Sequence, residues 1–147
     1  MKKTLMFTAV ASLFLCVMVA AVQADWMDRP EEGNQVVAAS KFMMAQANKI
    51  QSAKAIDRAW LTDEGHLLIK HGYDNIESGE MLQTDEGISY MQQIGRKVLE
   101  AGQIMLKMGR KTGTVTQAEK DTIAKQVQGM QGFGNLMLKN GQLMGGN

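Results

Sequence analysis

Two histidines and a set of methionines are the side chains in this sequence that could hold a metal ion or a haem iron. His66 and His71 are five residues apart, about 140° around a helix, so they cannot chelate one ion together. His71 could ligate a haem b iron together with a methionine sulfur, because four-helix bundles can hold a haem in the core. No covalent haem motif accompanies it, since Cys16 is the only cysteine.

Methionine is unusually frequent after residue 24, with ten copies at positions 27, 43, 44, 81, 91, 105, 108, 130, 137 and 144. Thioether sulfur is a soft ligand that would select Cu(I). The metal-ligand candidates are His71 and four of these methionines: Met91, Met105, Met130 and Met137. Met130, Met137 and Met144 are seven apart, which favours core filling by a flexible side chain. A sacrificial sink for oxidants is a third reading, because methionine sulfoxide can be reduced again.

Catalytic groups with a plausible partner are missing from the sequence. No serine, cysteine or paired-carboxylate constellation stands out, and the acidic residues fall at helix starts or on polar faces, where they favour solubility or the helix dipole. The sequence therefore predicts a protein that is not an enzyme.

The first 24 residues have the composition of a bacterial secretory signal peptide. Lys2 and Lys3 precede an apolar run over residues 5–22, which ends in Val22-Gln23-Ala24. Small residues at this exit predict cleavage after Ala24 rather than a retained anchor, and Leu15 before Cys16 argues against lipidation. We expect a periplasmic or secreted protein without membrane insertion after cleavage.

Cleavage would leave 14 basic and 15 acidic side chains and no cysteine. Such a balance carries no electrostatic signature of nucleic-acid binding. The remaining 123 residues suit one domain, which we place at 35–147 after a lead-in segment, 25–34, that contains Pro30.

Helix-start signals divide the chain into four helices. Thr62-Asp63-Glu64-Gly65 recurs as Thr84-Asp85-Glu86-Gly87, and Thr116 opens a capping-box pattern with Glu119. No segment alternates with a period of two, so a sheet is not expected. The prediction is an all-α antiparallel four-helix bundle with helices at about 35–61, 63–82, 85–111 and 117–143.

Glycines at heptad spacing are the second unusual feature. The pattern of glycine, polar residue, three apolar residues, lysine, variable residue and glycine occurs at 65–72, 102–109 and 134–141. Folding the predicted helices about their links places Ser52, Gly72, Gly95 and Gly134 in one layer. Each glycine costs roughly 1 kcal/mol relative to alanine, so close packing of backbones or a cavity for a ligand should offset it.

We therefore expect an exported helical-bundle binding protein, whose apolar glycine- and methionine-rich surface takes a protein partner or forms a homo-oligomer. The alternatives are a carrier of Cu(I) or non-covalent haem, and a methionine-based oxidant sink. Architecture alone does not discriminate among them.

Overall fold

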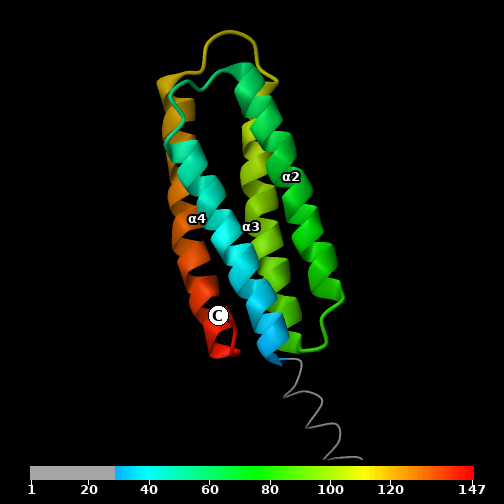
Figure 1. Ribbon diagram of the computed structural model, residues 1–147. Coiled ribbons are helices and arrows are strands. Elements are labelled where there is room, and N and C mark those ends of the chain that lie inside the picture. Colours follow the sequence, from blue (N-terminus) through cyan, green and yellow to red (C-terminus); the bar gives the residue numbers. More distant parts are fainter. Residues whose placement is uncertain (1–28) are drawn as a thin grey trace, which may run out of the picture.

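The computed structural model describes residues 29–147, which form an up-down-up-down bundle of four helices (Figure 1). A first helix covers 29–51, and α2 (Arg58–Glu80), α3 (Asp85–Gly109) and α4 (Gln117–Leu143) follow. The described residues contain no strand. The predicted all-α four-helix fold is confirmed.

Two of the predicted helix starts are confirmed by their caps. The Thr84 side chain accepts a hydrogen bond from the Gly87 amide at the start of α3. Thr116 and Glu119 form the complete capping box of α4, in which each side chain accepts from the other residue's backbone N–H. Because both caps are local in sequence, the predicted starts at 85 and 117 agree with the structure.

The boundary between the first two helices was predicted wrongly. The first helix ends ten residues early, at 51, and α2 begins at Arg58 with Asp57 as its N-cap, accepting from the Trp60 amide. Thr62 lies inside α2, where its hydroxyl donates to the Arg58 carbonyl. The same tetrapeptide thus begins α3 at Thr84 but lies within α2 at Thr62. The difference arises because Asp57 already caps α2 before Thr62.

The lead-in segment also differs from the prediction, because residues 29–34 are already helical. Pro30 lies in the first turn of this helix, where the N–H that proline lacks would have no partner within the helix. The predicted signal peptide, 1–24, and residues 25–28 lie outside the described residues.

Glu32 ties the beginning of the first helix to the beginning of α3. Its carboxylate accepts from the Gln83 amide at 2.5 Å, from the Thr84 amide and from the Thr84 hydroxyl. The side chain is only 4% exposed and is stabilised by these donors and by the positive end of the α3 dipole. An ion pair between Arg29 and Glu86, 2.8 Å apart, closes the same corner.

The helices approach one another most closely in two pairs, α2 with α3 and the first helix with α4. In both pairs a methyl group on an interface glycine would overlap the backbone of the facing helix. A single apolar cluster, to which all four helices contribute, fills the interior. No helix in the described part of the chain is both long and apolar enough to cross a bilayer.

Candidate binding groove

Gly72 and Gly95, two members of the predicted glycine layer, lie face to face across α2 and α3. A Cβ atom on Gly95 would stand 2.6 Å from the Gly72 carbonyl oxygen, and one on Gly72 would stand 2.9 Å from the Gly95 carbonyl oxygen. Gly65 and Gly102 repeat the arrangement one heptad away, with corresponding distances of 3.0 and 2.9 Å. The space beside each of these glycines is therefore filled by the neighbouring helix, and the glycines line no cavity.

Gly134 and Ser52 do not join that layer. Gly134 lies under the Met44 side chain of the first helix, where a Cβ atom would stand 2.5 Å from Met44 Cγ. Ser52 is exposed in the turn after the first helix and donates to the Lys49 carbonyl. The predicted layer of four residues was wrong for two reasons. The first helix ends before Ser52, and Gly134 of α4 packs against the first helix rather than against α2 or α3.

Sequence reasoning missed the small residues of the first helix. Gly33 faces Gly141 so closely that a Cβ atom on either would come within 2.9 Å of the other's carbonyl oxygen. Ser40 and Ala47 follow Gly33 at heptad spacing and are fully buried. The spacing of Gly33, Ser40 and Ala47 was the available signal, but the predicted helix began after Gly33 and ran past the true end.

The methionines proposed as metal ligands are part of the apolar core. Met91, Met105, Met130 and Met137 are each at most 3% exposed. His71 is half-buried on α2 and packs against Phe42 of the first helix, with ring centroids 4.2 Å apart. Among residues 29–147 no group of three or more His, Cys, Asp and Glu side chains could hold a metal ion.

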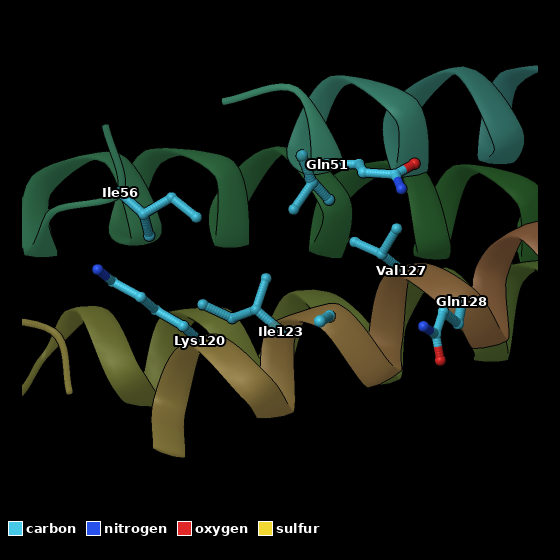
Figure 2. Close-up of a pocket in the computed structure, with 8 residues that line it drawn as sticks. Gln51, Ile56, Lys120, Ile123, Val127 and Gln128 are labelled. Atoms are coloured by element: carbon cyan, nitrogen blue, oxygen red, sulfur yellow. The ribbon is translucent and has the colours of Figure 1, made fainter. Parts of the chain in front are cut away.

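An open apolar groove lies at the end of the bundle where the first helix stops. Ile50, Ile123 and Val127 form its floor, each at most 3% exposed, and Ile56 overhangs it from the link at 52–57. Figure 2 shows Ile56 and Gln51 on one side of the opening and the side chains of Lys120, Ile123 and Val127 on the other, whereas the Gln128 amide points away from it. The groove exists because α4 extends beyond the last turn of the first helix at this end.

Its volume is about 160 Å³. Small-molecule sites typically enclose roughly 300–1,000 Å³, so this groove suits one or two inserted side chains better than a haem. Lys120 and the exposed Gln51 give the rim hydrogen-bond donors, and Lys120 gives it positive charge. An apolar floor with a polar rim is the usual anatomy of a protein-binding surface.

Arg58 holds the neighbouring α3–α4 link in place. Its guanidinium donates to the carbonyls of Met108, Gly113 and Thr114 at 2.8–3.0 Å. The same group pairs bidentately with the Glu119 carboxylate at 2.9 and 3.1 Å. This network fixes the N-terminus of α4, and with it the position of Lys120 and Ile123.

The pKa of Glu119 is held far below its ordinary value, first by the Arg58 guanidinium and then by the Thr116 amide and Lys111. The carboxylate therefore stays ionised and keeps its partners at neutral pH. Sequence reasoning identified Glu119 only as a capping residue, and no local pattern pointed to Arg58, 61 residues away.

Comparisons of the chain with protein families, with curated proteins and with solved structures give no match.

Proposed function

We propose that this chain is an exported, non-enzymatic binding protein that uses the groove at the end of its bundle, rather than its glycine layer, to hold side chains of a protein partner. The observation that carries the proposal is the groove floor of Ile50, Ile123 and Val127 beneath an open, basic rim. The glycines and buried methionines build the scaffold, because the former are covered by facing helices and the latter by the core.

Export is proposed from the sequence of residues 1–24. The mass of the protein purified from the periplasm should correspond to a chain that begins at Asp25. The same preparation should be colourless and free of stoichiometric metal, whereas a bound chromophore or copper ion would favour the carrier function.

The groove can be tested with toluene-4-sulfonate, whose apolar ring suits the floor and whose sulfonate suits Lys120. NMR of labelled isoleucine methyl groups should show saturable shifts at Ile50, Ile56 and Ile123. Ala124→Glu places a repelling carboxylate at the exposed edge of the groove and should abolish the shifts. Ala45→Glu is the matched control, because Ala45 is also exposed but lies on the first helix and does not line the groove. Shifts spread over many surface residues would overturn the proposal.

A further inference from the structure

The end of the bundle opposite the groove carries the most exposed large apolar side chain among residues 29–147. Met81 follows the last residue of α2 and is 74% exposed. Figure 1 shows the α2–α3 turn and the 52–57 link at opposite ends of the bundle. The groove and Met81 are therefore unlike surfaces that cannot meet within one molecule.

Met81 stands beside an acidic hollow, which it lines together with Glu31, Glu32, Gln35, Leu82 and Gln83. The surrounding residues extend the negative charge. Carboxylates at this end of the bundle that have no ion-pair partner within residues 29–147 belong to Glu31, Glu32, Glu77, Glu80 and Asp85. Arg29 and Glu86 form an ion pair and add no net charge, so the hollow keeps the charge of Glu31 and Glu32.

The groove end has the opposite balance. Two of its carboxylates, Glu64 and Glu119, are buried in ion pairs with Lys49, Arg58 and Lys111. The remaining exposed cations at this end are Lys54, Lys107, Arg110 and Lys120, against Asp57, Asp63 and Asp121. Lys120 lines the groove itself, as Glu31 lines the hollow beside Met81.

We infer that the partner held by the groove is a second copy of this chain, bound head to tail, with Met81 of one copy inserted between Ile56 and Ile123 of the next. This inference rests on the proposed binding function of the groove. An exposed apolar side chain flanked by carboxylates complements an apolar groove flanked by a lysine in polarity and in charge. Because the two surfaces differ, each copy keeps one of each free, and association continues into chains or closes into a ring.

The contact involves one protruding side chain and its rim, so the interface is small and the association is weak and salt-dependent. Sedimentation velocity should show a weight-average mass that rises with protein concentration and falls when salt is added. Met81→Lys changes an exposed side chain that the fold does not use, and it should leave a monomer at every concentration. A wild-type protein that remains monomeric at all concentrations would overturn the inference.

Cysteine pairing tests the polarity of the contact. The chain that begins at Asp25 contains no cysteine, so Met81→Cys and Gln51→Cys proteins, each with a single thiol, are prepared separately and mixed under mild oxidation. The mixed disulfide should form at least about tenfold faster than with Tyr73→Cys in place of Met81→Cys, because association raises the effective thiol concentration. Tyr73 is 57% exposed on α2 and lies away from the turn.

Two outcomes would count against the head-to-tail contact. Faster linkage of Met81→Cys to itself would indicate a symmetric contact between α2–α3 turns, and equal rates for Met81→Cys and Tyr73→Cys would indicate no contact. Saturable toluene-4-sulfonate binding in either case would leave the groove as a binding site for another partner. Loss of both signals would remove the proposed function as well.

Discussion

At the scale of single residues, the glycines of this protein divide into those that a facing helix requires and those that it does not. Gly95 leaves no room for a methyl group, since its Cβ atom would overlap the Gly72 carbonyl oxygen and Ile76. Gly132 sits inside α4 with nothing within 4 Å of such an atom. Alanine would raise the helix propensity equally at both positions, but its methyl group would meet neighbouring atoms only at Gly95.

Gly95→Ala should therefore destabilise the protein, because overpacking against backbone typically costs 1–3 kcal/mol. Gly132→Ala should stabilise it by about 0.5–1 kcal/mol through helix propensity alone. Urea unfolding of both variants beside the parent measures the two effects. A Gly95→Ala protein more stable than the parent would show that the α2 and α3 backbones separate at little cost.

Glu119 should make stability depend on pH. Its folded pKa is depressed from an ordinary value of 4.5, so its contribution is present above that value and is lost as pH falls through the folded pKa. Glu119→Gln should be less stable than the parent at neutral pH, and the difference should shrink in acid. Urea midpoints from about pH 7 to about pH 3 measure this, with the exposed Glu100→Gln as control. A constant difference would contradict the network around Arg58.

At the scale of helices, two identical tetrapeptides have different structural roles. Thr84 caps α3 and also donates its hydroxyl to the buried Glu32. Thr62 is an interior residue of α2 whose hydroxyl bonds to the preceding turn. The difference arises because Asp57 begins α2 five residues before Thr62.

Thr84→Ala should cost about 1–2 kcal/mol, since it removes a helix cap and a donor to a buried carboxylate. Thr62→Ala should cost less than half as much, because alanine restores helix propensity. Thermal or urea unfolding compares them directly. Equal losses would mean that the cap and the Glu32 contact contribute little.

At the scale of the whole molecule, the two close helix pairs enclose a core rich in methionine. Seven of the nine methionines among residues 29–147 are buried, and Met43, Met105 and Met130 are at most 1% exposed. Met81 alone is highly exposed. A core of thioethers adapts to the uneven space beside glycine-packed helices.

Dilute hydrogen peroxide should consequently oxidise Met81 first, whereas Met43, Met105 and Met130 should react only after the fold opens in urea. Peptide mapping by mass spectrometry of native and unfolded protein gives the order. Rapid oxidation of the buried methionines in the folded protein would contradict this order and would favour the function as an oxidant sink.

The sequence by itself determined the helical class, the starts of α3 and α4 and the facing of Gly72 on Gly95, because caps and heptad spacing are local signals and a short link forces antiparallel register. Only the tertiary structure decided where the first helix ends, because neither glycine nor proline lies in 52–57 to mark the break. Residues of good helix propensity leave the helix there so that Asp57 can cap α2 and Arg58 can bind the α3–α4 link. The groove follows from that ending. Its floor of Ile50, Ile123 and Val127 joins residues more than 70 positions apart, and no local pattern predicts which apolar side chains the neighbouring helix leaves uncovered.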